Sequence, residues 1–426
     1  MTFCYVVTTI GLLRPTLLPG LARIRRGPRT VQFGVDPQRA VLVELADERA
    51  AAVLDLLDGA HTERQVLAGA LRLGVRPADA RDLLGTLHAH GLLVAAHTLN
   101  PPGVAPHLRA EAAALALRRA DHRLPGRWAY RGPLSAAAQE RPGAGAGPTG
   151  RTPAADAQER PGAGAGSTGR MAAGADRERP GAGVARTGRT SASGGSVVEN
   201  TVGLLTPAQV LRRRANARVA VAGRGRLAAP IAIALARSGV GHVRPDLPGN
   251  VRPEEVALGL DPAAVGRPRS VVVAQAVVAA GGRPGRGKPH LVVQVGAEQP
   301  ADLAAAALRR RGQAVLAVEI RDGTPVVGPF VEAGGSPCLG CLEQHRSDRD
   351  PAWSEIAAGL ATAPPAEEAC DLVTIMTAAA FAAAEALTHI DGGAPRTIGG
   401  AVTVVSPGDL RRRHWPAHPR CSCVRT

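Results

Sequence analysis

The clearest hydrophobic pattern lies in the second half of the chain, where short apolar runs alternate with a turn and a helical segment. The apolar run 219–222 has the length of a buried parallel strand. A glycine-containing turn at 223–228 follows it, and the next residues predict a helix over about 230–238. A second short strand at 241–243 leads to Asp246. This order of strand, turn, helix, strand and acid predicts a βαβ unit of a parallel sheet.

The turn inside this unit has the residue types that a phosphate-binding turn requires. Gly223 can adopt the backbone angles of a tight turn, Gly225 leaves room for a phosphate to approach the main chain, and Ala228 lets the helix pack close to the strand. The N-terminus of the helix presents free N–H groups to an anion. Asp246 follows Ala228 by 18 residues, about where a carboxylate holds the ribose hydroxyls of a nucleotide. The alternative is a βαβ unit whose turn binds nothing.

The segments that follow alternate between strand and helix patterns. In chain order, the pattern predicts a strand at 289–295, a helix at 301–311, a strand at 314–320 and a hairpin turn with a strand at 323–330. The segment 251–260 has the composition of a loop, and 270–280 fits a strand or a helix equally well. This alternation predicts an α/β domain with a doubly wound, Rossmann-like sheet over residues 198–426.

A smaller unit with a different pattern precedes this domain, over residues 14–98. Its predicted elements are two strands joined by a turn, three helices and a closing strand, at 32–35, 40–44, 48–57, 62–73, 77–90 and 92–94. This order indicates a small winged helix-turn-helix domain of the α+β class. A role as a DNA-binding regulator is disfavoured because Asp79 and Asp82, at the start of the third helix, would face the phosphates. A winged domain that makes only protein contacts is a further alternative.

Between the two units, residues 120–197 are rich in Gly, Ala, Pro, Arg and Thr. The sequence QERPGAG at 139–145 recurs from Gln158 and, as RERPGAG, from Arg177, with a period of 19 residues. The segment has almost no large apolar side chains, so it cannot bury enough surface to offset the entropy of ordering it. We predict a duplicated, disordered linker that carries no chemistry.

The overall composition argues against a nucleic-acid partner. The chain has 426 residues, of which 45% are hydrophobic, and a formal net charge of +15. Its basic residues are almost all arginines scattered along the chain, and only 2% of the residues are aromatic. The aromatic platforms on which nucleic-acid bases stack are therefore missing, and we expect no specific nucleic-acid partner.

The apolar runs and the cysteines indicate a compartment. No apolar run reaches the roughly 18–20 residues that span a bilayer, so we expect no membrane partner. The first dozen residues lack the basic region of a signal peptide, and residues 1–13 fit a loose tail better. Six cysteines in a chain of this length do not form a disulfide framework. Together these features predict a cytoplasmic protein.

Four of the six cysteines form two close pairs, and the second pair follows the first by 80 residues. Cys338 and Cys341 belong to a C-x-x-C in a turn marked by Pro and Gly, and Cys421 and Cys423 form a C-x-C. Four thiolates from two such pairs are the ligand set of a tetrahedral, structural Zn²⁺ site. A redox-active C-x-x-C is the alternative, but it leaves the second pair unexplained. The nearby histidines are expected to be neighbours of the metal site and not ligands: His345, His414 and His418.

Several segments together resemble known families. The segments 217–246, 326–330 (VVGPF), 338–353 (CLGCLEQHRSDRDPAW) and 415–423 are similar to those of the ThiF-type adenylyltransferases, bacterial relatives of ubiquitin-activating enzymes, in an actinobacterial branch. This similarity covers about residues 198–426. In the smaller unit, 31–37, 54–59 and 87–94 resemble PqqD-like peptide-recognition elements, which bind an extended leader peptide. The whole chain thus resembles leader-peptide-binding ThiF-like proteins of azoline-forming peptide pathways.

The resemblance implies ATP-dependent activation of a peptide or ubiquitin-like protein, whose C-terminal carboxylate becomes an acyl adenylate. By position, the turn 223–228 would lie under the phosphates of ATP, and Asp246 would hold the ribose. Arg267 and Arg269 are candidates to clamp phosphate charge, together with Mg²⁺. The implied partners are a precursor leader peptide or ubiquitin-like protein, a cyclodehydratase, and a second copy of the chain in a homodimer. The resemblance identifies no catalytic residue.

Three features depart from the pattern of active members. Those members have a magnesium-binding aspartate after the strand that ends here at Val295, whereas this chain has Gly296-Ala297-Glu298. An arginine replaces the expected lysine near Gly266, and the usual Asn-Arg pair after Asp246 is not evident. Cys370 is either an acceptor thiol for a thioester or a buried small residue. Two hypotheses remain: an adenylating enzyme, or a catalytically inactive ThiF-like scaffold that binds a leader peptide and recruits a cyclodehydratase.

Overall fold

The computed structural model describes residues 11–36, 39–99, 105–121, 206–296, 307, 311–362 and 368–424. Residues 1–10 of the tail, residues 122–197 of the repeat-containing linker and most of the predicted helix 301–311 lie outside the described residues. What we predicted for those segments stays a prediction. All described residues belong to one unit of the chain, Met1–Leu134 together with Leu205–Thr426.

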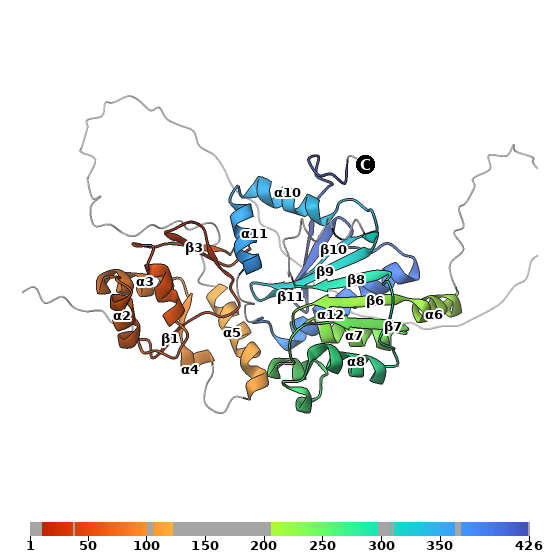
Figure 1. The fold of residues 1–426 in the computed structure, drawn as a ribbon, viewed down its shortest axis with the longest axis horizontal. Helices are drawn as coiled ribbons and strands as arrows, with labels where there is room; N and C mark the ends of the chain where they lie inside the picture. Colours follow the sequence, from red (N-terminus) through yellow and green to blue (C-terminus); the bar gives the residue numbers. More distant parts are fainter. Residues whose placement is uncertain are drawn as a thin grey trace, which may run out of the picture. The chain divides into compact units, whose positions relative to one another are not determined.

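A seven-stranded sheet forms the centre of the C-terminal region (Figure 1). Its strands are β6 (Arg218–Gly223), β7 (His242–Asp246), β8 (Leu291–Val295), β9 (Ala314–Arg321), β10 (Thr324–Val331), β11 (Gly400–Ser406) and β12 (Asp409–His414). They lie in the order β12-β11-β10-β9-β8-β6-β7. The pairs from β7 to β9 are parallel, and those from β9 to β12 are antiparallel. The predicted βαβ unit and the predicted strands that became β8, β9 and β10 are confirmed.

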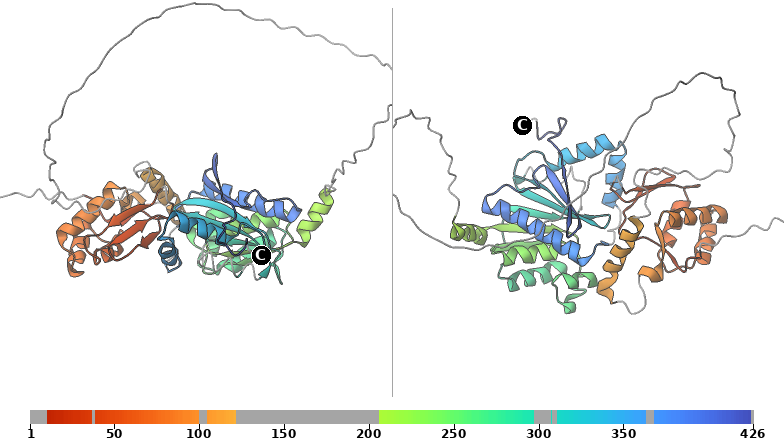
Figure 2. Two further views of the ribbon diagram at one scale, coloured as in Figure 1. Left: turned by 90° about the horizontal axis from the view of Figure 1, so that it is seen from above. Right: turned by 180° about the vertical axis from the view of Figure 1, so that it is seen from behind.

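Three apolar helices cover one face of this sheet: α7 (Ala228–Arg237), α8 (Arg269–Ala279) and α12 (Leu372–Asp391). α12 runs beside α7 and also contacts β10 and β11 (Figure 2). Their small and branched apolar side chains form one buried core with alternate residues of the strands, such as Val293, Val295 and Val318. Burying each such side chain contributes about 1.5–3 kcal/mol relative to leaving it exposed. The other face keeps half-buried residues among the described part of the chain, and the predicted helix 301–311, which would extend the second layer of a doubly wound sheet, lies mostly outside it.

The helix α12 corrects the expectation that no apolar run is long enough to span a bilayer. It has 20 residues with a mean hydropathy of 1.4 in its most apolar window, which is sufficient by length and composition. Half of that window is buried in the structure, against α7 and the sheet. A core helix of an α/β domain passes the same test, because alanine-rich packing faces are as apolar as a membrane segment.

The connecting segments are more helical than expected. The ambiguous segment 270–280 forms α8, and the expected loop 251–260 contains the 3-10 helix η3 (Pro253–Leu258), followed by η4 (Pro262–Ala264). The sequence pattern for a loop was wrong here because Pro253 starts a short helix and a buried side chain, Glu255, anchors it. Two further helices, α10 (Leu339–Arg349) and α11 (Trp353–Thr362), follow β10, and α6 (Pro207–Asn216) precedes β6.

The smaller N-terminal part has its own core and two small sheets. One sheet has the order β2-β3-β4, and the other pairs β1 with β5. The elements are β1 (Pro15–Leu17), β2 (Arg23–Arg25), β3 (Thr30–Phe33), β4 (Val41–Glu44), α1 (Ala50–Val53), η1 (Leu54–Leu56), α2 (Glu63–Arg72), α3 (Pro77–Ala89), β5 (Leu93–Ala95), α4 (Ala96–Leu99), η2 (Pro106–Leu108) and α5 (Arg109–Asp121). All six predicted elements are present, and Thr62 forms a capping box with Gln65 at the start of α2. The assignment to a winged helix-turn-helix or PqqD-like class stays a prediction.

Polar contacts connect the N-terminal part to the sheet region. The Asp322 carboxylate, in the β9–β10 turn, accepts hydrogen bonds from the backbone N–H groups of Val35 (2.6 Å) and Asp36 (2.7 Å). In α5, Arg118 forms an ion pair of 2.6 Å with Asp371, the residue that caps the N-terminus of α12. The N-terminal part therefore contacts the chain just before α12, next to the site described below.

Candidate functional site

The glycine turn after β6 lies where the strand order of the sheet changes direction. β7 follows β6 on one side of it, whereas β8 lies on the other side. In open α/β sheets, ligands bind in the crevice beyond the carboxyl ends of the strands at such a point. The backbone N–H of Arg224 donates to the carbonyl of Val295 at the end of β8 (2.9 Å). The turn is thereby fixed across the ends of β6 and β8.

Gly223 is required by this close approach. Its φ is +107°, and a Cβ built on it would lie 2.0 Å from the carbonyl oxygen of Val295. No side chain fits in that space, and the backbone conformation is one that residues with a Cβ rarely adopt. The prediction that Gly223 makes a tight turn is therefore supported by a specific steric reason.

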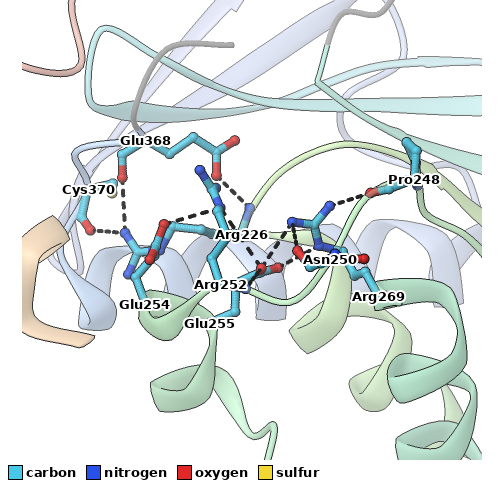
Figure 3. A network of polar contacts seen from close by, with 9 residues as sticks. All are labelled: Arg226, Pro248, Asn250, Arg252, Glu254, Glu255, Arg269, Glu368 and Cys370. Atoms are coloured by element: carbon cyan, nitrogen blue, oxygen red, sulfur yellow. Dashed lines mark hydrogen bonds and ion pairs between the residues drawn. The ribbon is translucent and has the colours of Figure 1, made fainter. Parts of the chain in front are cut away.

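Gly225 leaves a space that an anion occupies. Its φ is +132°, and a Cβ built on it would lie 2.4 Å from Oε1 of Glu368. The other carboxylate oxygen of Glu368, Oε2, accepts a hydrogen bond of 2.5 Å from the backbone N–H of Arg226 (Figure 3). The space that Gly225 was predicted to leave for a phosphate is thus filled by a carboxylate of the same chain.

Arg226 is the buried anchor of this contact, and sequence reasoning missed it. The residue is 1% exposed, and its Nη1 donates to the carbonyl oxygens of Glu368 (3.1 Å) and Cys370 (2.5 Å). Its Nε is buried and has no hydrogen-bond partner among the residues that the structure describes. Burial lowers the pKa of Arg226, although nearby carboxylates oppose this effect. Its position inside the G-x-G-x-x-A motif was the one available signal.

Two further predicted residues of the turn region are at the expected edge of the sheet. Asp246 ends β7 and pairs in register with Ala222, one residue before the turn. Its side chain is exposed and accepts from Nε of Arg244 (2.9 Å). Ala228 is fully buried at the start of α7, as close packing of helix and strand requires. Their roles in binding a nucleotide stay predictions.

The two arginines predicted to clamp phosphate differ in their surroundings. Arg269 is buried, and its guanidinium bonds both carboxylate oxygens of Glu255 (2.9 and 3.0 Å). It also donates to the carbonyl oxygens of Pro248 (2.5 Å) and Asn250 (2.9 Å), as Figure 3 shows. These bonds fix the loop after β7, so the same donors are not available to a ligand in this arrangement. Arg267 is exposed and donates to Gln275 (3.2 Å).

Cys370 has the properties of a buried small residue. It is 1% exposed, and burial raises the pKa of its thiol to about 12. A thiol with so high a pKa has almost no thiolate at neutral pH, and the thiolate is the nucleophile in thioester formation. The described surroundings therefore favour the interpretation of Cys370 as a packing residue.

The two cysteine pairs come together as the sequence predicted. The four Sγ atoms of Cys338, Cys341, Cys421 and Cys423 lie within 4.8 Å of one another. Sγ of Cys341 lies 3.3 Å from Sγ of Cys423, and Sγ of Cys338 lies 3.6 Å from Sγ of Cys421. A tetrahedral Zn²⁺ with Zn–S bonds of about 2.3 Å requires S···S separations of roughly 3.8 Å. The donor set and its spacing therefore fit a zinc ion.

The sulfur atoms differ in their affinity for a proton. Burial raises the pKa of Cys341 to about 12. Burial also acts to raise the pKa of Cys423, but hydrogen bonds from Ser336 and from the neighbouring thiols outweigh it and lower this pKa to about 7. These opposite shifts arise from burial and from the close approach of the sulfurs to one another, and binding of a cation would require the thiols to lose their protons.

Two of the three histidines predicted to lie near the cluster, His345 and His418, have hydrogen-bond partners other than the cysteines. Nε2 of His418 lies 2.8 Å from Asp348 Oδ2, and its Nδ1 accepts from the backbone N–H of Arg420 (3.1 Å). Nε2 of His345 lies 3.0 Å from the carbonyl oxygen of Pro416. Both nitrogens of His418 are thus engaged, and the group of potential metal ligands among the described residues consists of the four cysteines.

A cleft of about 1620 Å³ lies over the half-buried face of the sheet. Residues of β9 to β12 and of α10 and α11 line it, including Glu319, Arg321, Thr403 and Arg346. Gly296 also lines it, and a Cβ built on this residue would lie 2.7 Å from the carbonyl oxygen of Arg224 in the glycine turn. The cleft and the turn therefore meet at the carboxyl end of β8.

Comparison with known proteins leaves the family open. No protein-family model matches the sequence, and a search of curated proteins finds no match. Among solved structures, E. coli MccB is similar over 96% of this chain and 96% of its own length, with 12% sequence identity and a TM-score of 0.42.

Two further structures have comparable values. The microcin C7 biosynthetic enzyme MccB in complex with N-formylated MccA covers 96% of this chain and 99% of its own, with 12% identity and a TM-score of 0.41. PaaA covers 50% of this chain and 77% of its own, with 17% identity and a TM-score of 0.40. At these identities and TM-scores, the similarities carry no argument about activity, ligand or partner. The function must be argued from the geometry of the site.

Proposed function

We propose that this protein binds ATP at the turn 223–228 and activates the C-terminal carboxylate of a peptide or small ubiquitin-like protein as an acyl adenylate. It would act in the modification of ribosomal peptides, as the resemblance to ThiF-type adenylyltransferases implies. The observation that carries the proposal is the carboxylate on the turn: Glu368 lies in the space left by Gly225 and on the N–H of Arg226. A main-chain site that already holds one anion, at the N-terminus of α7, suits a phosphate.

The positions of the other groups support the same reaction. Asp246 ends the strand next to the turn, where its carboxylate would hold ribose hydroxyls. The cleft that meets the turn at Gly296 would hold an extended peptide with its carboxyl end toward the phosphates. Attack of that carboxylate on the α-phosphate forms the acyl–phosphate bond and breaks the bond to the leaving pyrophosphate. Such a step requires fixed positive charge and positioning more than an acid or base.

The segment after β8 differs from the magnesium-binding segment of active family members. The residue after β8 is Gly296, and the sequence continues with Ala297 and Glu298 in place of the aspartate of active family members. Two buried carboxylates of this region are already engaged: Glu368 bonds the turn, and Glu255 bonds Arg269. The exposed Asp246 is assigned to the ribose, and we assign no magnesium ligand.

The remaining parts of the chain would supply structure and partner recognition. Zn²⁺ held by Cys338, Cys341, Cys421 and Cys423 would tie the segment 415–424 to the start of α10. The N-terminal part would bind a precursor leader peptide beside a strand edge, and its class would be PqqD-like. Action in the cytoplasm, as a homodimer and with a cyclodehydratase, belongs to the same proposal.

The second candidate is a catalytically inactive scaffold that binds the leader peptide and recruits the cyclodehydratase. Two observations favour it: the missing magnesium aspartate and the filled anion position at Gly225. In this second candidate, the turn keeps the backbone of a nucleotide-binding site but binds no nucleotide. The function is then binding of the leader peptide by the N-terminal part and recruitment of the cyclodehydratase.

An ATP–pyrophosphate exchange assay separates the two candidates. With a candidate precursor peptide, the enzyme reading predicts exchange that falls by at least about tenfold in Asp246→Ala, because two hydrogen bonds to the ribose are lost. Asp261→Ala, an exposed carboxylate that only caps η4, is the matched control and should retain exchange. Absence of exchange in the wild-type chain, together with measurable binding of the peptide, would support the scaffold.

A further inference from the structure

The carboxylate on the glycine turn is an internal ligand of the site, contributed from a distant part of the sequence. Glu368 and Gly225 are 143 positions apart, and the contact is made through both carboxylate oxygens. Oε1 lies where a Cβ would be at residue 225, and Oε2 accepts from the N–H of residue 226. A phosphate oxygen bound to this turn would require the same space and the same N–H.

Arg226 and Glu368 each bond the main chain of the other through a side chain, so the two segments hold each other in position. The main chain of Arg226 bonds the side chain of Glu368, while the side chain of Arg226 bonds the main-chain carbonyls of Glu368 and Cys370 (Figure 3). The Arg226 guanidinium is buried beneath the turn, and its Nε still has a free hydrogen-bonding direction among the described residues. One buried donor of Arg226 is therefore unsatisfied even with Glu368 present.

The surroundings of Glu368 make it a poorly stabilised occupant. Burial raises the pKa of its carboxyl group, although the N–H of Arg226 and the charges of Arg252 and Arg226 oppose this. The nearby carboxylate of Glu255 acts in the same direction as burial. These surroundings thus disfavour the ionised form of Glu368 relative to its protonated form. A phosphate would bring more acceptor oxygens to the same N–H.

We propose that Glu368 is a displaceable, autoinhibitory ligand of the turn, which a phosphate group of the substrate must replace before it can bind. This inference rests on the proposed nucleotide-binding function and adds a mode of regulation to the same site. The chain next to Glu368 offers a route for control. Asp371 is held by Arg118 of α5, and the backbone N–H of Leu372 donates to Glu111 of the same helix. Movement of α5 would therefore shift the segment that carries Glu368.

Two substitutions at Glu368 test the inference in the full-length protein. Glu368→Ala removes the carboxylate, and Glu368→Gln removes its charge while it keeps the size and one acceptor oxygen. The matched control is Glu254→Gln, because Glu254 belongs to the same charged network but contacts Arg252 and not the turn. Binding of ATP and, separately, of inorganic pyrophosphate is measured by titration calorimetry, and thermal unfolding checks that each variant is folded.

The expected result is that both ligands bind the two Glu368 variants more tightly than the wild type. If the carboxylate occupies the turn for about nine-tenths of the time, its removal strengthens the apparent affinity about tenfold. Glu254→Gln should bind like the wild type, which excludes a general effect of lost negative charge. If Glu368→Ala does not fold, the comparison is made between the wild type and Glu368→Gln alone.

The outcomes separate the inference from the proposed function. Tighter binding of pyrophosphate without binding of ATP supports the displaceable carboxylate and contradicts the nucleotide function. Binding of ATP that is equal in the wild type and both variants overturns the inference and leaves the nucleotide function intact. Weaker binding of ATP with Mg²⁺ in the variants also overturns it, because Glu368 would then assist the nucleotide or its metal. No binding of either ligand to any variant rejects both.

Discussion

The glycine turn and the cysteine cluster are both encoded by short sequence motifs, but they differ in what pairs with their polar groups. At the turn, the backbone N–H of Arg226 donates to a carboxylate and its Nη1 to carbonyl groups of the same chain, while its Nε has no partner among the described residues. In the cluster, the fold brings together four sulfur atoms, which repel one another once they are ionised. The turn can therefore fold without a ligand, whereas the cluster requires a cation to be stable with all four sulfurs ionised.

The largest expected effect is at the cluster. Cys421→Ser should lose the bound zinc and the stabilisation that comes with it, about 4 kcal/mol when free zinc exceeds its Kd by a thousandfold. Elemental analysis and thermal unfolding of the purified protein measure the two losses. Cys370→Ser is the control, since Cys370 is buried away from the group of four. Equal zinc contents in both variants would contradict the assignment of the site.

A steric test of the turn is expected to have the next largest effect. Gly223→Ala should destabilise the fold by about 3 kcal/mol, because its Cβ would overlap the carbonyl oxygen of Val295 and its φ is positive. Gly281→Ala has a similar φ of +91° but no atom within 4 Å of the added Cβ. It should cost only about 1 kcal/mol of backbone strain. Urea unfolding of the two variants measures the difference, and equal losses would mean that strain, and not the approach of β8, requires the glycine.

The smallest expected effect concerns the residue that connects α5 to the site. Burial alone would raise the pKa of Asp371, but hydrogen bonds from Thr374 and the contact with Arg118 outweigh it, so the pKa lies below its ordinary value. Because the folded-state pKa is lowered, this stabilisation is present above the ordinary aspartate pKa near 4 and is lost as the pH falls through the folded-state value.

Asp371→Ala should therefore cost about 1 kcal/mol at neutral pH, as the loss of a helix cap does. The difference in unfolding free energy between wild type and variant should shrink below about pH 4. Unfolding curves recorded from neutral to acid pH give that difference. A difference that stays constant over this range would show that the ionised carboxylate is not the stabilising group.

The sequence determined the parts of this protein that depend on local pattern. The strand–turn–helix–strand order around Gly223, the capping of α2 by Thr62 and the division of the cysteines into two pairs could all be predicted. These features follow from side-chain periodicity and from backbone conformations that few residues adopt, so neighbours in the sequence contain the information. The segment 270–280 could not be assigned, because a run of valines fits both a buried strand and a buried helix.

Only the tertiary structure decided what the predicted residues contact. Nothing near Glu368 in the sequence indicates that its carboxylate fills the space at Gly225, and Arg269 was expected to face phosphate although Glu255 binds it. The first contact joins residues more than 140 positions apart, and the second joins α8 to η3, 14 positions before it. Both form because buried charged groups need partners, which the fold supplies from other elements. The local pattern therefore predicted a turn with a free N–H and space for an acidic group. Only the fold determined that the carboxyl group of Glu368 lies there.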